Sequence, residues 1–201
     1  MAASRCSCID HRSDGHRILR IGPPHRPPRV DFGDTAHILG LGGSPRRPLR
    51  SAIVQTDEFW ALLTLLDRER IDDDFEEDEE DPVTEPLVRA LAAREPADIT
   101  AFDDLLSEHL FELDGQAWAG NAGVCGEFED LFLYCRCVVV ASGREVYQAV
   151  LANPLLMPEG MEFERLLDVA ERAWSRRTGD PYEHVPSHSL EMRANTANWP
   201  N

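Results

Sequence analysis

Apolar residues recur at intervals of three and four along most of the chain after residue 55, the spacing that places them on one face of an α-helix. The stripe is clearest over residues 96–113, where it consists of Ile99, Phe102, Leu106, Leu110 and Leu113. Similar stripes run through residues 57–70, 84–94, 127–141, 144–153 and 162–178, and a short helical piece is expected around Trp118. The spacing therefore predicts six to seven short helices.

Turn-forming residues separate these stripes. Pro96 starts the longest one, Ser142-Gly143 divides two others, and Gly179 follows the last. The run Val138-Val139-Val140 alone would favour a strand, but the periodicity before it favours a helix. We therefore predict an all-α fold, a compact bundle of six to seven short helices over residues 55–179.

Residues 1–54 differ from the rest, because they hold nine Arg, six Pro and six Gly without such periodicity. This composition buries too little apolar surface to offset the entropy of ordering, which predicts a disordered leader. Three interpretations stay open: a basic segment that binds an acidic surface, a metal-binding segment built on Cys6, Cys8, His11 and His16, or an untranslated stretch with the true start near Val54. The third is favoured. At the other end, residues 180–201 are polar and are predicted to form a loose tail.

The charge is as unevenly distributed as the apolar residues. Residues 1–54 carry a net +5, whereas residues 55–201 combine 33 acids with 11 Arg for a net −22, and the two sum to the −17 of the chain. Nine of the acids lie within residues 72–81, which are predicted to form a solvated linker. A body this acidic repels phosphates, so we expect a basic protein as its partner rather than nucleic acid or a membrane surface.

The composition also indicates a compartment. All 20 cationic side chains are Arg and none is Lys, which is typical of a bacterium with a GC-rich genome. The five Cys are odd in number and form no disulfide framework or zinc module, so reduced thiols are expected. No apolar run approaches the roughly 20 residues needed to cross a bilayer, and no signal-peptide pattern is present. We expect a cytoplasmic protein without a metal or cofactor.

The candidate binding residues are Trp118, Glu127, Glu129, Asp130, Arg144 and Glu145. The three acids of residues 127–130 form a turn that suits a metal or general acid–base chemistry, but acids also complement the dipole at the start of a helix. Arg144 lies at a corner between two helices, where it can clamp a carboxylate or phosphate or tie the corner to an acid of the bundle. Trp118 suits either a core or an interface. No phosphate loop, nucleophile elbow, dinucleotide fingerprint or zinc-protease helix accompanies them.

Three stretches of the body carry a more specific pattern. They are Asp57-Glu58-Phe59-Trp60, Ala117-Trp118-Ala119-Gly120 with Gly123-Val124-Cys125, and Ser142-Gly143-Arg144-Glu145-Val146-Tyr147 leading into Leu151-Ala152-Asn153-Pro154. With them, residues 57–179 resemble the bacterial family known as domain of unknown function 4240. The family's usual Ser-Asp-Asp-Gly-Phe run is replaced here by Gly126-Glu127-Phe128-Glu129-Asp130, which changes any site built on that turn. The resemblance implies no established activity, and because members begin close to their Phe-Trp pair it supports a start near Val54.

These observations predict a small acidic accessory or regulatory domain that binds a basic protein, and they lean away from an enzyme. The alternative is a metal-dependent or nucleic-acid-linked hydrolase that uses Glu127, Glu129, Asp130 and Arg144. It requires these four side chains to converge in one pocket. In a third hypothesis, the Arg-rich leader binds nucleic acid and the acidic body regulates it.

Overall fold

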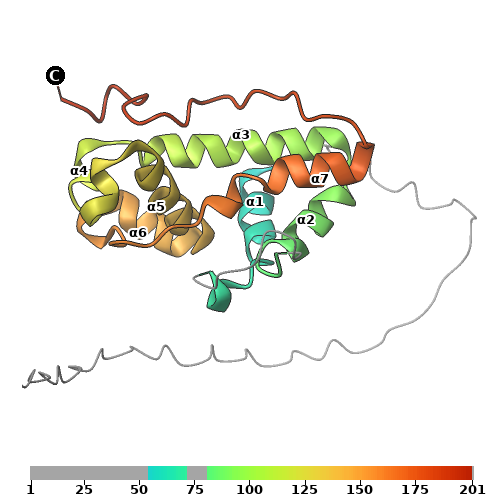
Figure 1. Cartoon of the computed structure of the whole chain (residues 1–201), viewed down its shortest axis with the longest axis horizontal. Coiled ribbons are helices and arrows are strands. Elements are labelled where there is room, and N and C mark those ends of the chain that lie inside the picture. The colour runs from blue at the N-terminus through green and yellow to red at the C-terminus, as the bar shows by residue number, and fades with distance from the viewer. Residues whose placement is uncertain (1–53, 72–80, 201) are drawn as a thin grey trace, which may run out of the picture. The chain divides into compact units, whose positions relative to one another are not determined.

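The longest helix, α3 (Pro96–Glu112), has the other helices on one side and the C-terminal tail on the other (Figure 1). The computed structural model describes residues 54–71 and 81–200, so the predicted leader and residues 72–80 of the predicted linker lie outside the described residues. The other α-helices are α1 (Thr56–Leu63), α2 (Glu85–Ala92), α4 (Gln116–Ala119), α5 (Glu129–Ala141), α6 (Arg144–Ala152) and α7 (Val169–Thr178). Four 3₁₀ turns join them: η1 (Arg68–Arg70), η2 (Gly123–Glu127), η3 (Pro154–Leu156) and η4 (Glu164–Leu166). These two described ranges contain no strand, which confirms the all-α prediction.

The core consists of the predicted apolar stripes. Four of the five residues of the longest stripe lie in α3 and the fifth, Leu113, follows it, and all five are at most 2% exposed. In α5, every residue from Cys135 to Ala141 is buried. A helix that is enclosed on all sides is apolar around its whole circumference, which explains why Val138–Val140 resembles a strand in sequence.

Two helices are shorter than the apolar spacing predicts. The stripe of residues 57–70 is helical only to Leu63, and the chain continues through η1 while Leu66 stays buried. Likewise, α7 starts at Val169 rather than near residue 162, and Phe163 is buried from a non-helical backbone whose N–H donates to the Tyr134 carbonyl at 3.2 Å. An apolar residue every third or fourth position also fits 3₁₀ turns and bends, so the spacing alone overextended both helices.

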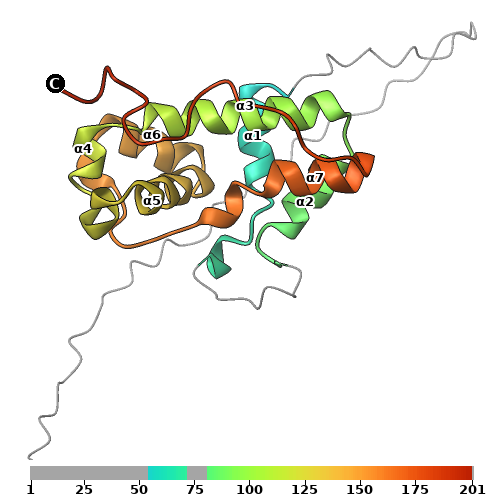
Figure 2. The same cartoon turned by 45° about the horizontal axis from the view of Figure 1, so that its top comes forward.

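The tail, residues 180–200, departs most from the prediction. It follows α3 in both views (Figures 1 and 2) and reaches α4, where the Gln116 N–H donates to the Asn198 carbonyl at 3.0 Å. From Tyr182 to Met192, every second residue is partly buried and those between are exposed. The expectation of a loose tail is wrong, because side chains of the helices supply the hydrogen bonds that an extended polar segment lacks internally.

Candidate functional site

The predicted binding residues lie in two separate places. Glu127, Glu129 and Asp130 surround the start of α5, whereas Arg144 and Glu145 begin α6, just after the end of α5. A helix of 13 residues is about 20 Å long at about 1.5 Å per residue, so α5 itself separates the acids from Arg144. The four side chains that the hydrolase alternative needs therefore do not converge in one pocket.

The acids belong to a junction that is fixed by close backbone packing. η2 lies against α4 so closely that a Cβ on Gly126 would stand 1.8 Å from the Ala119 carbonyl oxygen, which only glycine permits. Phe128 then takes an extended conformation, with φ −122° and ψ 136°, before α5 begins. This extended residue leaves its ring outside the core, with 55% of the residue exposed.

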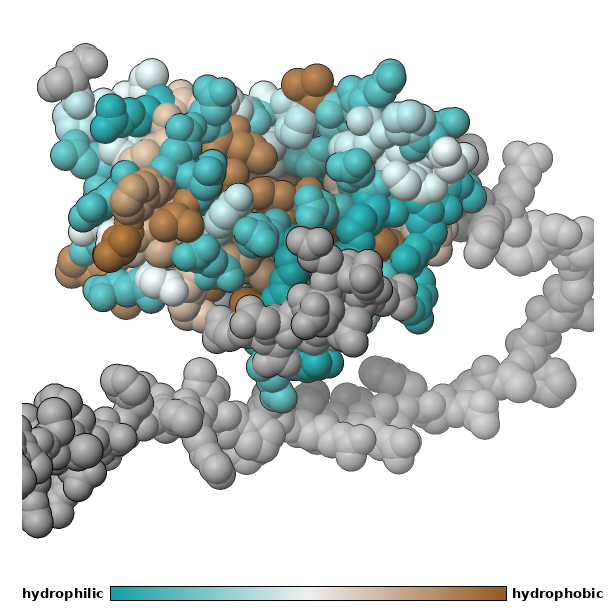
Figure 3. All heavy atoms as spheres, in the orientation of Figure 1, coloured by the Kyte–Doolittle hydropathy of each residue, from teal (hydrophilic) through white to brown (hydrophobic). Residues whose placement is uncertain are grey.

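Four large apolar side chains are exposed at this end of the molecule: Val124, Phe128, Leu155 and Leu156. They come from η2, the residue after it, and η3, and both turns contact α4. A Cβ on Gly123 would lie 3.7 Å from Glu159, which places the chain after η3 beside η2. Figure 3 shows apolar residues gathered at the end where α4, α5 and α6 lie in Figure 1.

Acids flank these apolar residues. Glu127, Glu129, Asp130 and Glu159 are all exposed. Within the described ranges, none of them forms an ion pair, although Glu129 accepts a hydrogen bond from the Met192 N–H at 3.3 Å. We call the four exposed apolar residues and these four acids the apolar–acidic surface. Because none of these acids is in an ion pair within the described residues, the field of this surface attracts cations and basic groups.

The thiols beneath this surface are structural. Cys125, Cys135 and Cys137 are free and buried, and the Cys135 Sγ donates to the Pro158 carbonyl at 2.9 Å. Burial raises the pKa of the Cys135 and Cys137 thiols to about 12, which keeps both protonated near neutral pH. A protonated, enclosed thiol is a poor nucleophile, so these residues serve the packing of α5.

Arg144 and Glu145 line a different feature, a groove of about 460 Å³ between α1 and α6. Trp60 forms part of its wall, and the Arg144 guanidinium is paired with Asp57 across it, with Nη1 2.7 Å from Oδ1. The Asp57 side chain is 86% exposed, and an ion pair this exposed contributes about 0–1 kcal/mol. Arg144 thus ties the helix corner to α1, and two of the stretches that carry the family resemblance meet here.

Aromatic residues and one histidine fill the space beneath this groove. Trp60 stacks on His109 at 4.9 Å between ring centroids, and the Tyr147 hydroxyl donates to the Glu112 carboxylate. Burial lowers the pKa of His109, which leaves the ring neutral near pH 7. The cluster is a packed part of the core in which His109 acts as an aromatic ring.

Trp118 is a packing residue rather than part of either surface feature. Its indole Nε1 donates to the Val150 carbonyl at 3.0 Å, which joins α4 to α6. The residue is partly buried against the core. Of the six predicted residues, Glu127, Glu129 and Asp130 share one surface, Arg144 and Glu145 share the groove, and Trp118 belongs to neither.

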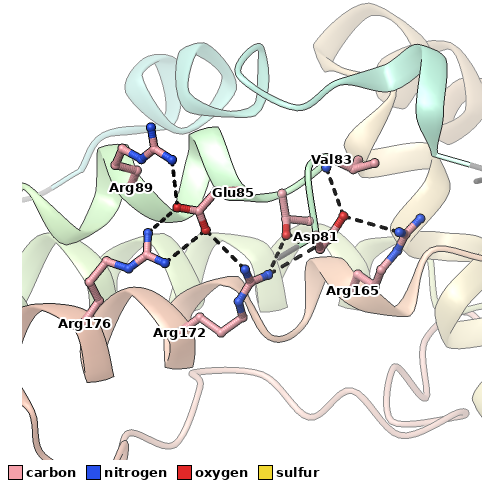
Figure 4. Close-up of polar contacts among 8 residues, drawn as sticks. Asp81, Val83, Glu85, Arg89, Arg165, Arg172 and Arg176 are labelled. Carbon is pink, nitrogen blue, oxygen red and sulfur yellow. Dashed lines mark hydrogen bonds and ion pairs between the residues drawn. The ribbon is translucent and has the colours of Figure 1, made fainter. Parts of the chain in front are cut away.

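The sequence interpretation missed a buried carboxylate that is surrounded by arginines (Figure 4). Glu85, at the start of α2, is 5% exposed, and its two oxygens accept from Arg89 of the same helix and from Arg172 and Arg176 of α7. Arg172 and Arg176 are four residues apart and so lie on one face of α7, a spacing that could have indicated an acidic partner. All the oxygens are occupied from within the chain, so the network fixes α2 to α7 and leaves no open site.

Asp81 extends this network to the end of the predicted linker. Its carboxylate accepts from the Val83 N–H at 2.9 Å and the Thr84 hydroxyl at 2.6 Å, which caps the turn into α2. Arg165 lies 3.3 Å from the same carboxylate (Figure 4). It also donates to the Ile71 carbonyl at 2.6 Å. One guanidinium therefore holds together the two described residues that flank 72–80.

No three His, Cys, Asp or Glu side chains in residues 54–71 and 81–200 are arranged to hold a metal ion. None of the helices in that part of the chain combines the length and apolar character needed to cross a bilayer.

Comparison with known proteins identifies the family. No curated protein and no solved structure matches the chain. The model of the family described as protein of unknown function (DUF4240) matches residues 54–176, which include α1 to α6 and most of α7 and exclude the tail. Because this match covers more than half of the 201 residues, the chain belongs to the DUF4240 family of proteins of unknown function.

Proposed function

We propose that this protein is a small accessory domain that binds another protein through the apolar–acidic surface. The partner presents a segment with both basic and apolar side chains. The observation that carries this proposal is the exposure of Val124, Phe128, Leu155 and Leu156, at 53–75% each, beside four acids. Isolated exposed apolar residues are ordinary on a protein surface, whereas a group of them from adjacent turns favours an interface.

The two kinds of residue have separate roles in such binding. Covering one large apolar side chain contributes about 1.5–3 kcal/mol, so Phe128 and Leu155 are the expected anchors. The acids contribute mainly to the rate and selectivity of association, because they attract a basic partner over a distance of about 10 Å at 0.1 M salt. Affinity is therefore expected to rest on the anchors, and its salt dependence on the acids.

The hydrolase alternative receives less support. It depends on Glu127, Glu129, Asp130 and Arg144 acting together, and α5 lies between the acids and the arginine. Burial raises the pKa of the Cys135 and Cys137 thiols, and His109 beside the groove is neutral and stacked on Trp60. These two thiols and His109 therefore do not form a nucleophile with an adjacent base.

The test is an affinity capture at low salt from a lysate of the source organism, using the full chain. We expect a basic protein that is retained by the parent chain and lost with the double variant Phe128→Ser/Leu155→Ser. The matched control is Val185→Ser, which changes an apolar residue that is 82% exposed but lies on the tail, outside the apolar–acidic surface. Retention of the same proteins by all three chains would contradict the proposal.

A charge variant tests the other half of the proposal. Glu127→Gln/Asp130→Asn keeps the apolar anchors and removes two of the acids. Capture of the basic partner should become weaker and less sensitive to salt, because fewer charges remain to be screened. Unchanged salt sensitivity would show that these acids do not face the partner.

A further inference from the structure

The end of the tail donates hydrogen bonds to a fully buried carboxylate. Asp114, between α3 and α4, is 0% exposed. Its oxygens accept from the backbone N–H of Arg193 at 3.1 Å, the backbone N–H of Asn195 at 2.9 Å and the indole Nε1 of Trp199 at 2.9 Å. In the described part of the chain, all side-chain hydrogen bonds of Asp114 thus come from the tail.

The middle of the tail accepts a hydrogen bond from a fully buried arginine. Arg136 of α5 is 0% exposed, and its guanidinium donates to the Leu110 carbonyl of α3 at 3.0 Å and the Leu190 carbonyl of the tail at 2.8 Å. The guanidinium lies over the ring of Phe132, with its central carbon 4.9 Å from the ring centroid. One of these two hydrogen bonds of the buried guanidinium is therefore accepted by the tail backbone.

Residues at the start of the tail form hydrogen bonds with two acids of α3. The Tyr182 hydroxyl donates to Asp103 at 2.8 Å. Asp104 accepts from the Ser187 N–H at 2.9 Å and lies 3.0 Å from the His184 Nε2. We call Asp103, Asp104, Asp114 and Arg136 the tail groove. Asp103 and Asp104 lie on α3, Asp114 follows that helix and Arg136 lies on α5, so the four residues contact the tail along its length rather than at one point.

The tail occupies this groove as a bound peptide would. In the described residues 180–193, the one backbone–backbone hydrogen bond of the tail is that of the Glu191 carbonyl, which accepts from the Ala194 N–H at 3.2 Å, and the alternate side chains of residues 182–192 face the helices. The family match ends at residue 176, so the groove residues belong to the matched domain and the tail lies beyond it. At the junction, Gly179 takes a left-handed φ of 78°, and the two residues that follow are exposed, which leaves room for a change of direction.

We propose that the tail groove is a peptide-binding site whose ligand is residues 182–199, and that a second copy of this chain supplies this ligand when a molecule's own tail is released. An occupant is favoured, because release of the tail removes the hydrogen bonds that Asp114 accepts from it and one of the two that the Arg136 guanidinium makes. The tail is the segment that makes these contacts. Another copy of this chain carries the same segment, and we therefore identify a second copy as the partner. A tethered tail has an effective concentration in the millimolar range, so the molecule's own tail binds first.

Two full-length variants test this exchange. The first, Tyr182→Ala/Trp199→Ala, weakens its own tail and keeps an intact groove. The second, Asp114→Ala, weakens the groove and keeps an intact tail. Each should remain monomeric alone, whereas their mixture should form a one-to-one complex, seen as a doubling of molar mass in size exclusion with light scattering. If Asp114→Ala does not fold by circular dichroism, Asp104→Ala takes its place as the groove variant.

The control is a chain that carries both sets of substitutions, which should not associate with either variant. A labelled peptide of residues 181–200 gives an independent readout: it should bind the first variant and bind the groove variant at least tenfold more weakly. A mixture that stays monomeric, or equal binding of the peptide to both variants, would overturn the proposal. So would self-association of either variant alone, because the contact would then lie elsewhere.

Discussion

At the scale of single residues, Gly143 allows two helix ends to be joined. Its backbone has φ 98° and ψ 172°, a conformation that is accessible almost only to glycine. A Cβ there would stand 2.9 Å from the Arg68 Nη2. Arg68 donates to the Ala141 carbonyl at 2.8 Å and the Leu63 carbonyl at 3.3 Å, which are the last residues of α5 and α1. The missing side chain is thus what lets one guanidinium satisfy both helix ends.

The substitution Gly143→Ala should therefore act through both strain and displacement of Arg68. We expect it to lower the free energy of unfolding by about 2–3 kcal/mol, at the upper end of the range for a strained backbone. Gly160→Ala is the matched control, because Gly160 also has a positive φ, of 67°, but has nothing within 4 Å of the added Cβ. Urea unfolding of both variants gives the comparison. Equal losses would show that Arg68 moves aside at no cost.

At the scale of elements, the contact between α2 and α7 combines apolar packing with the Glu85 network (Figure 4). Leu87, Val88 and Leu91 of α2 are 0% exposed. Glu85 lies at the first turn of the same helix, where a negative charge also complements the helix dipole. The arginines of α7 therefore hold the end of α2 that the apolar residues do not reach.

Replacing Glu85 should loosen this pair of helices. For Glu85→Gln we expect a loss of about 2 kcal/mol in the free energy of unfolding, less than the 3–5 kcal/mol typical of a broken buried pair. The reason is that the Arg172 and Arg176 side chains are 31% and 41% exposed and can be hydrated. The control is Glu95→Gln, whose pair with Arg177 is 3.5 Å long and exposed on both sides, for which we expect below about 1 kcal/mol. Similar losses at both positions would contradict a special role for Glu85.

The elements also show what the sequence could and could not predict. Helix α3 was predictable in full, because its stripe of five apolar residues has a single consistent face. The segments around Leu66 and Phe163 were not, since their apolar spacing fits irregular backbone equally well. Arg136 could not be recognised as buried, because a lone charge inside an apolar helix gives no sign of the carbonyls that receive it.

The candidate site was predicted only in part, and the reason is again physical. The acids of residues 127–130 lie on one surface, but the sequence contains no sign of the exposed Leu155 and Leu156 beside them. These two residues follow a buried face of α6 and look like its continuation. The tail did contain a signal, because Tyr182, His184, His188, Leu190 and Met192 occupy alternate positions, the period of an extended segment with one face buried.

At the scale of the whole molecule, charge is segregated. Arg89, Arg165, Arg172, Arg176 and Arg177 lie in or near the contact of α2 with α7. They make up five of the 11 Arg in residues 55–201, whereas 33 acids are spread over the same residues. Acids therefore outnumber arginines three to one in these residues, and their net negative charge repels itself.

Salt should consequently stabilise this protein. Raising NaCl from about 0.01 M to about 0.1 M shortens the screening length from about 30 Å to about 10 Å, which weakens repulsion between exposed acids more than attraction within half-buried pairs such as Glu85 with its arginines. We expect the midpoint of thermal unfolding to rise by about 2–4 °C for each kcal/mol gained, as followed by circular dichroism. A chain with Asp72→Asn/Asp73→Asn/Asp74→Asn has three fewer charges and should show a smaller rise. A midpoint that falls with salt would instead mean that the arginine pairs outweigh the repulsion of the net −22 charge on residues 55–201.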